Sequence, residues 1–169
     1  MMARPARTGR PRTAARVAAV QALFQSEQNG ETAETVIDQF VRHRLGSLPG
    51  PENPGFEEGR MPDAHVPLFT RIVRTAVAEQ DRLDGLIATA LPAEWPMLRL
   101  DPVLRAMLRA GGAELTMQDG PPSRVVINEY LDVAHGFFAG EEPRMVNGML
   151  DRLARELRPA EFGELPAAT

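Results

Sequence analysis

Arginine is the residue type through which this chain could do most of its surface chemistry, because all 19 of its strongly basic side chains are arginines and none is a lysine. Residues 1–26 contain five arginines and no acidic residue, whereas residues 27–169 contain 14 arginines and 23 acidic residues. A guanidinium can pair with a phosphate through two hydrogen bonds and can stack on a base. A basic arm on an acidic body indicates nucleic-acid contact, with a solubilising tail as the equal alternative on charge alone.

Residues that would carry catalysis are largely missing from the sequence. Without Cys there is no thiol nucleophile, disulfide or thiolate metal site, and without Lys there is no standard phosphate-binding P-loop. Neither H-E-x-x-H nor G-x-S-x-G occurs, and the three histidines, His43, His65 and His135, have no metal-ligand spacing. We therefore predict a non-enzymatic protein that uses no cofactor and no metal.

The chain is also predicted to have no membrane span, since no run of about 18 apolar residues occurs. The N-terminal arginines are not followed by the apolar segment of a signal peptide. The lack of Cys fits a reducing compartment. We expect a cytoplasmic protein.

Apolar residues recur at helical spacing through most of the chain, and no segment alternates convincingly as a strand. Proline, glycine and capping residues mark the ends of the helices. The pattern predicts an all-α fold of about seven helices in two packed helical bundles. The expected helices span about 13–28, 32–45, 66–91, 102–117, 122–138 and 143–157, with a short turn at 93–98.

The expected organisation is one helical domain over residues 13–158, preceded by a disordered arm (1–12) and followed by a loose tail (159–169). Within this domain we expect an N-terminal bundle at about 13–91, a C-terminal bundle at about 92–158 and a flexible loop at 46–64, which is rich in Pro and Gly. Gly111 and Gly112 stand inside a predicted helix, which indicates a close approach between helices.

Four segments resemble one known family in order and spacing, across about residues 10–158. Arg16-Val-Ala-Ala-Val-Gln-Ala-Leu-Phe24 is similar to its opening helix, typically A-R-x-x-A-V-Q-A-L-[YF]. Residues 103–115 are similar to V-E-R-A-I-L-R-L-G-A-Y-E-L, residues 125–130 to V-A-I-N-E-A and residues 145–151 to F-V-N-G-V-L-D. This is the NusB family of transcription antitermination proteins.

The resemblance implies two small helical bundles that bind the boxA element of nascent ribosomal RNA as single-stranded RNA. It also implies NusE, a small ribosomal subunit protein, as partner, with the other Nus factors and RNA polymerase contacted indirectly. The position-by-position match indicates Glu141 for partner binding. The residues it indicates for RNA binding are Arg7, Arg10, Arg12, Arg16, Phe24, Arg144, Met145 and Asn147.

Structural alternatives exist for two of these assignments. Phe24 could simply pack in the core against Val17 and Val20. In the pair Asn147-Gly148, Gly could serve a close helix contact while Asn ties backbone groups in the core.

The chain departs from the family pattern at three positions. Leu104 stands in place of a frequent Glu, Ala113 in place of Tyr, and Met145 in place of Phe, which is a better stacking platform. These changes bear on RNA affinity and on its dependence on the partner, and leave the expected fold intact.

Two rival functions share the predicted fold. One is a helical RNA-binding module like that of rRNA cytosine methyltransferases, without a catalytic domain. The other is a protein–protein adaptor whose arginine arm is only a tail. A homodimer through the face expected to bind the partner is a further alternative.

Overall fold

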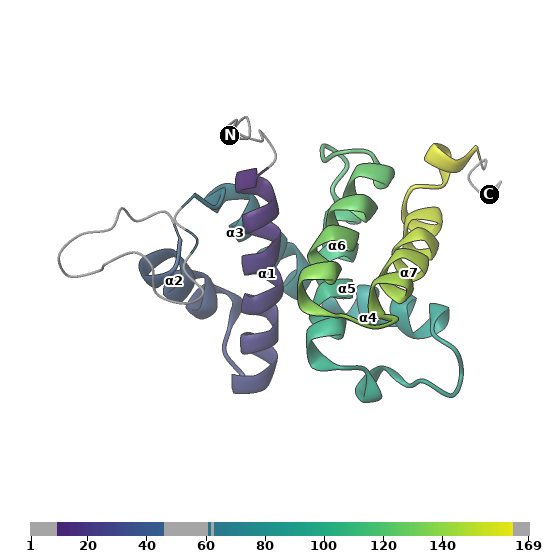
Figure 1. The fold of residues 1–169 in the computed structure, drawn as a ribbon, viewed down its shortest axis with the longest axis horizontal. Helices are drawn as coiled ribbons and strands as arrows, with labels where there is room; N and C mark the ends of the chain where they lie inside the picture. Colours follow the sequence, from purple (N-terminus) through teal and green to yellow (C-terminus); the bar gives the residue numbers. More distant parts are fainter. Residues whose placement is uncertain (1–9, 46–60, 62, 164–169) are drawn as a thin grey trace. The chain divides into compact units, whose positions relative to one another are not determined.

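The computed structural model describes residues 10–45, 61 and 63–163, and these residues form seven α-helices and two short 3-10 helices. Their only strand-like feature is an isolated bridge between Leu45 and Met61. The all-α prediction is therefore confirmed (Figure 1). The helices are α1 (Arg10–Asn29), α2 (Ala33–His43), α3 (Val66–Ala78), α4 (Gln80–Ala90), α5 (Pro102–Thr116), α6 (Ser123–Phe137) and α7 (Glu142–Leu157), with η1 (Met97–Arg99) and η2 (Pro159–Phe162).

The chain divides into two compact units between Arg74 and Thr75, within α3. Because α4 packs against α5 and α7, it belongs to the second unit. The sequence-based boundary near residue 91 had placed this segment in the N-terminal bundle. Residues 46–60 and 62 of the predicted 46–64 loop lie outside the described part of the chain.

In the first unit α1 packs against α2, and an aromatic pair joins α2 to α3. The rings of Phe40 and Phe69 stack with their centroids 5.5 Å apart, and both residues are buried. The guanidinium of Arg44 lies 4.6 Å from the centroid of the Phe40 ring. Such aromatic and cation–π contacts add stability beyond the burial of apolar area.

Hydrogen bonds between polar side chains join the end of α1 to α2. Gly30, with φ of +67°, ends α1 in the left-handed conformation that glycine adopts at low cost. The carboxylate of Glu31 then accepts hydrogen bonds from Gln25 of α1 at 3.1 Å and from Gln39 of α2 at 2.7 Å. These hydrogen bonds, the one from Gln25 first, lower the pKa of Glu31. The predicted cap Thr32 accepts from the backbone N–H of Thr35 at 3.1 Å.

The start of α1 is tied to the segment that leads into α3. The backbone N–H of His65 donates to the Pro11 carbonyl at 2.9 Å, while its imidazole Nδ1 accepts from the backbone N–H of Leu68 at 3.1 Å. His65 thereby caps the first turn of α3 and holds residue 11 in place. Since α1 begins at Arg10, the last three residues of the predicted arm are helical.

The predicted single helix over 66–91 is wrong in one respect, because it is divided at Glu79. This residue has φ −100° and ψ 12°, outside helical values, although its N–H still donates to Thr75 and its carbonyl accepts from Leu83. The apolar period runs through the break and neither Gly nor Pro marks it. The sequence therefore carries no local signal for this division.

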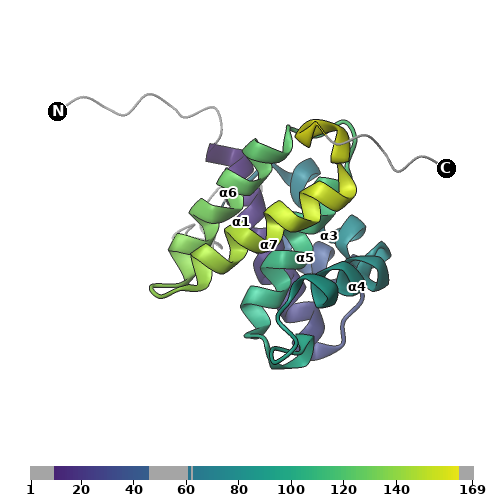
Figure 2. The ribbon, with the colours of Figure 1, turned by 90° about the vertical axis from the view of Figure 1, so that its right-hand side faces the viewer.

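Helix α5 is the central helix of the second unit, and every residue from 104 to 115 is buried. In Figures 1 and 2, α5, α6 and α7 lie side by side, in agreement with their contacts. A Cβ on Gly111 would lie 2.8 Å from a terminal carbon of Leu150, and one on Gly112 would lie 2.9 Å from a terminal carbon of Leu83. The predicted close approach at these glycines is confirmed.

Arg105 of α5 fixes the connector between α4 and α5. The buried Arg105 donates to the carbonyls of Met97 and Leu100, each at 3.0 Å. Asp101 accepts from the N–H groups of Val103 and Leu104, and Pro102 occupies the first helical position, as predicted from the sequence. The connector is thus held by hydrogen bonds from a residue of the helix that it leads into.

The segment after α7 is ordered as far as residue 163, which differs from the loose tail expected from residue 159. Arg158 donates to four backbone carbonyls, those of Glu114, Leu115, Met117 and Pro121, at 2.7–3.0 Å. The carboxylate of Glu161 accepts from the backbone N–H and hydroxyl of Ser123 at 2.9 and 3.1 Å. These bonds fasten η2 to the end of α5 and the start of α6; residues 164–169 lie outside the described part.

Candidate nucleic-acid interface

The predicted basic contacts of the first unit differ in their exposure. Arg7 and the side chain of Arg10 lie outside the described part of the chain. Arg12 is exposed on the first turns of α1, whereas Arg16, one turn later, is only 3% exposed and engaged in polar interactions. Burial removes a guanidinium from ready contact with a phosphate, so the structure separates Arg16 from the other predicted RNA contacts.

Phe24 lies on a half-buried stripe of α1 with Val17 and Gln21, at spacings of three and four residues. Val20, on the neighbouring face, is completely buried. Phe24 therefore takes an intermediate position between the two sequence-based alternatives, with part of its ring covered and part open to solvent.

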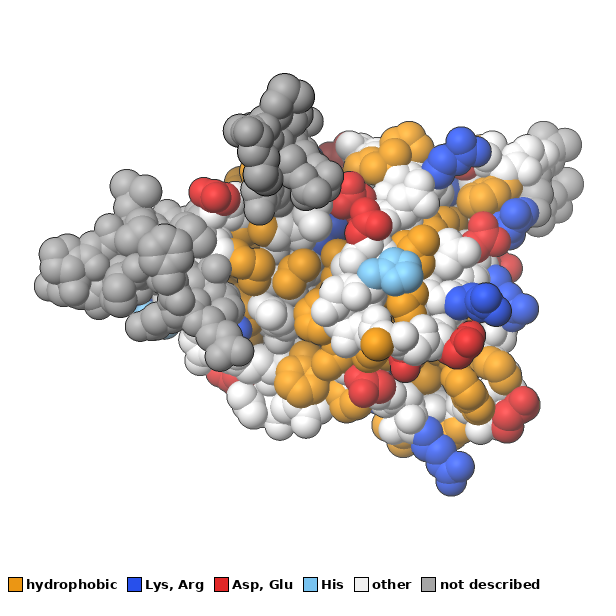
Figure 3. Space-filling view, viewed as in Figure 1, with side chains coloured by type: hydrophobic (Ala, Val, Ile, Leu, Met, Phe, Trp, Pro, Cys, Tyr) orange, Lys and Arg blue, Asp and Glu red, His pale blue; other side chains and the backbone are white. Residues whose placement is uncertain are grey.

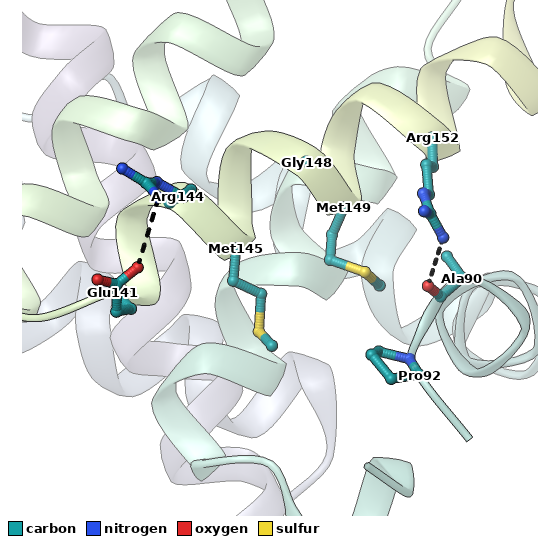
Figure 4. Close-up of a pocket in the computed structure, with 8 residues that line it drawn as sticks. All are labelled: Ala90, Pro92, Glu141, Arg144, Met145, Gly148, Met149 and Arg152. Carbon is teal, nitrogen blue, oxygen red and sulfur yellow. Dashed lines mark hydrogen bonds and ion pairs between the residues drawn. The ribbon is translucent and has the colours of Figure 1, made fainter. Parts of the chain in front are cut away.

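In the second unit, three predicted site residues come together at the start of α7. Glu141, Arg144 and Met145 line one open groove of about 330 Å³. The groove continues along α7 past Gly148, Met149 and Arg152, and Ala90 and Pro92 form its opposite wall (Figure 4). The residues of α7 recur at helical spacing, which places them on one face of that helix.

The groove has an apolar floor between charged side chains. Met145, Met149 and Pro92 point into it in Figure 4. At one end, Arg144 and Glu141 pair weakly at 3.9 Å, with both side chains 88% exposed. At the other end, Arg152 donates to the Ala90 carbonyl at 2.9 Å. A flat apolar group could lie on this floor with anionic groups near the two guanidiniums.

Asn147 is exposed and is not among the groove-lining residues, so the structure separates it from Met145. Its exposure does not fit the alternative in which it ties backbone groups in the core. Nor is Gly148 at a close helix contact, since a Cβ built there would meet nothing within 4 Å. A glycine inside a helix costs about 0.5–1 kcal/mol relative to alanine, and packing within the described fold does not explain it.

Two of the family departures lie in the packed interior. Leu104 is 4% exposed and Ala113 is completely buried. The third, Met145, is half-buried in the groove wall.

Among the described residues, the carboxyl groups whose pKa values are shifted take part in structural hydrogen bonds. The carboxyl groups of Glu31, Glu34 and Glu161 have lowered pKa values, caused first by hydrogen bonds from Gln25, from Arg74 and from the backbone N–H of Ser123, respectively. On the face in Figure 3, acidic and basic side chains of the second unit are interspersed. Among the described residues no three His, Cys, Asp or Glu are grouped to hold a metal ion. None of the described helices is long and apolar enough to cross a membrane.

Comparisons with known proteins identify the family. The model of the NusB family matches residues 13–155, which is most of the chain. The chain belongs to the NusB family. It is 72% identical over 156 residues to the transcription antitermination protein NusB of Granulibacter bethesdensis, covering 92% of this chain and 94% of that protein. The NusB of Gluconobacter oxydans is 56% identical, with 88% and 89% of the two chains covered.

Solved structures agree with this assignment at the level of the fold. A NusB of T. maritima matches with a TM-score of 0.67 and 27% identity, over 96% of this chain and 99% of the other. The NusB of Aquifex aeolicus gives a TM-score of 0.64 at 24% identity, over 94% and 97% of the chains. The predicted family, fold and role as a non-enzymatic transcription antitermination factor are thereby confirmed.

Sequence reasoning missed one side of the groove. The spacing of residues 141, 144, 145, 148, 149 and 152 on a predicted helix would have placed them on one face. Nothing in the sequence indicates that Ala90 and Pro92 form the opposite wall, because that juxtaposition depends on how α4 packs against α7.

Proposed function

We propose that this protein binds the boxA element of nascent ribosomal RNA transcripts as single-stranded RNA, together with NusE, and thereby suppresses premature transcription termination. The observation that carries the proposal is the 72% identity to a transcription antitermination protein over 92% of the chain. A protein of the same fold, at 22% identity and a TM-score of 0.67, has been solved as NusB with NusE in complex with double-stranded RNA.

The proposal specifies a single strand for a chemical reason. Unpaired bases can be splayed out and placed on apolar or aromatic side chains, while guanidiniums contact the phosphates. Arg12 and Arg144 are exposed, and Phe24 and Met145 are half-buried, so these four have accessible surface for such contacts. Arg7, Arg10 and Asn147 complete the proposed RNA-binding set, and the buried Arg16 is assigned to positioning α1.

The partner is needed on energetic grounds. The four arginines of this set, Arg7, Arg10, Arg12 and Arg144, give a log–log salt slope of roughly −2.8 with a single strand if each contacts one phosphate, which corresponds to weak binding at physiological salt. NusE would add contact surface and order the binding groups beforehand. We assign Glu141, exposed at the end of the groove, to partner binding.

Fluorescence anisotropy tests the proposal directly. A labelled RNA of about a dozen nucleotides carrying boxA is compared with a scrambled RNA, with and without NusE, at two salt concentrations. We expect a preference for boxA that NusE increases and salt weakens. Equal affinity for both RNAs in the presence of NusE would contradict boxA recognition, and binding of NusE without any RNA would leave an adaptor.

The remaining assignments follow from this role. We propose that the protein works in the cytoplasm, where nascent bacterial transcripts are made, and reaches RNA polymerase through other Nus factors. A homodimer would use the partner face in the absence of NusE. Sedimentation with increasing amounts of NusE distinguishes the two, because a shared face makes homodimer and heterodimer mutually exclusive.

A further inference from the structure

Three helical glycines, Gly85, Gly136 and Gly148, are exposed and have no packing role in the described fold, and of these Gly148 lines the groove on α7. It lies inside α7, is exposed, and has no atom within 4 Å of the position a Cβ would occupy. At Gly111 and Gly112, in contrast, a Cβ would lie too close to a neighbouring leucine side chain, so glycine has a packing role at both positions. A helical glycine without a packing role is typical of a place where a ligand approaches the backbone closely.

The surroundings of Gly148 form the middle of the groove on α7. Met145 and Met149 flank it along the helix, and Pro92 lies opposite (Figure 4). Arg144 and Arg152 stand eight residues apart on the same face, which is about 12 Å along the helix axis. The groove therefore has an apolar floor, exposed backbone at Gly148 and a guanidinium at each end.

We propose that this groove holds one unstacked base of the bound RNA, lying over Gly148 against the half-buried thioether of Met145, with the buried Met149 forming part of the floor and Arg144 and Arg152 contacting the flanking phosphates. The inference rests on the proposed RNA-binding function and extends it to Gly148, Met149, Pro92 and Arg152. Met can pack on the flat face of a base, although less strongly than an aromatic ring.

Charge favours RNA over a protein segment as the occupant. The two guanidiniums carry ten N–H donors between them, and Arg152 gives one of these to the Ala90 carbonyl. The acidic group on the groove, Glu141, lies at one end beside Arg144 rather than over Gly148. A base at the centre with phosphates on both sides matches this order of apolar and cationic groups.

The decisive variant is Gly148→Ala, because it should stabilise the protein and weaken RNA binding together. Higher helix propensity in an open position is expected to raise Tm by about 2–4 °C. The added methyl group occupies the space over which the base lies, and losing one stacked base weakens affinity by about 5- to 150-fold. Gly85→Ala in α4 is the matched control, since Gly85 is also helical, exposed and open around its Cβ.

Binding is measured by anisotropy with the boxA RNA in the presence of NusE, using an intact strand and strands with one abasic nucleotide at each position in turn. For the wild-type protein, one abasic position should lose affinity. For Gly148→Ala, that same position should cause no further loss, because the base is already displaced. Arg152→Gln should reduce the salt slope by about 0.7, whereas Arg155→Gln, outside the groove, should not.

The outcomes separate the two proposals. If the wild-type protein binds no RNA with NusE, the proposed function and the base site both fail. If wild type binds boxA and Gly148→Ala binds it equally well, the base site alone is overturned. Loss of NusE binding by Gly148→Ala, with abasic effects unchanged, would assign the groove to the protein partner instead.

Discussion

The same substitution, glycine to alanine, is expected to have opposite effects at two positions in the second unit. At Gly111 the new Cβ would lie 2.8 Å from a side-chain carbon of Leu150, which is completely buried and cannot move into solvent. We expect Gly111→Ala to destabilise the protein by about 1 kcal/mol despite its better helix propensity. Urea unfolding, compared with the stabilised Gly148→Ala, tests this contrast. A gain in stability at Gly111 would mean that Leu150 repacks without strain.

Glu31 gives the first unit a stability that depends on pH. Its pKa is lowered in the folded protein by hydrogen bonds from Gln25, Asn29 and Gln39, so the folded state favours the charged carboxylate. This contribution is fully present above the ordinary pKa of Glu and is lost as the pH falls through the lowered value.

We expect Glu31→Gln to lower Tm at pH 7 and to have a smaller effect at pH 3, since wild type loses the charged carboxylate at low pH. Thermal unfolding followed by circular dichroism over this range measures the difference. Glu94→Gln, at an exposed connector residue, is the control. A constant difference in Tm from pH 3 to pH 7 would assign the effect of Glu31→Gln to shape rather than charge.

At the level of elements, α6 depends on a cap that comes from far along the chain. Pro122 precedes α6 and offers no side-chain cap, and the first-turn N–H of Ser123 instead donates to Glu161, 38 residues later. Because the partner is a carboxylate, the N-terminal end of the helix dipole is also compensated.

Replacement of Glu161 by alanine should therefore destabilise the protein by about 1 kcal/mol, the usual loss for a helix cap. Hydrogen exchange should increase first at the start of α6, where the donor loses its acceptor. Asp101→Ala, which removes the local cap of α5, serves as comparison and should increase exchange at Val103 and Leu104 instead. Unchanged exchange in α6 after loss of Glu161 would mean that water replaces the carboxylate.

The elements that the sequence predicts well are those with local signals. The start of α5 follows from Asp101-Pro102, and the close contacts of α5 follow from paired glycines in a helical period. The division at Glu79, the cap from Glu161 and the groove wall at Pro92 depend on contacts between distant segments. Sequence periodicity cannot reveal these features, because each residue involved also fits an uninterrupted helix or a plain loop.

Much of the predicted site has the same limitation. Arg144 and Met145 follow from the resemblance, and the structure brings them into one groove with Glu141. The burial of Arg16 and the separation of Asn147 from the groove could not be predicted, because they depend on which face of each helix is covered.

At the scale of the whole molecule, the charge distribution of the chain sets the strength and salt dependence of RNA binding. Residues 1–26 contain five arginines and no acidic residue, whereas residues 27–169 contain nine more acidic residues than arginines. On the face in Figure 3 the charges of the second unit are mixed, so the described surface there offers no broad attraction for RNA. Long-range attraction should therefore come mainly from the N-terminal arginines.

Deletion of residues 1–9 tests this division and keeps the fold intact, because the structure places Arg10 at the start of α1 and uses the Pro11 carbonyl to bind His65. The deletion removes Arg7, the one residue of the proposed RNA-binding set in this segment, so the log–log salt slope for boxA RNA should become shallower by about 0.7. The preference for boxA over scrambled RNA should persist, since phosphate contacts carry no sequence information. An unchanged salt slope would identify the arm as a solubilising tail, and a lost preference would mean that it reads bases directly.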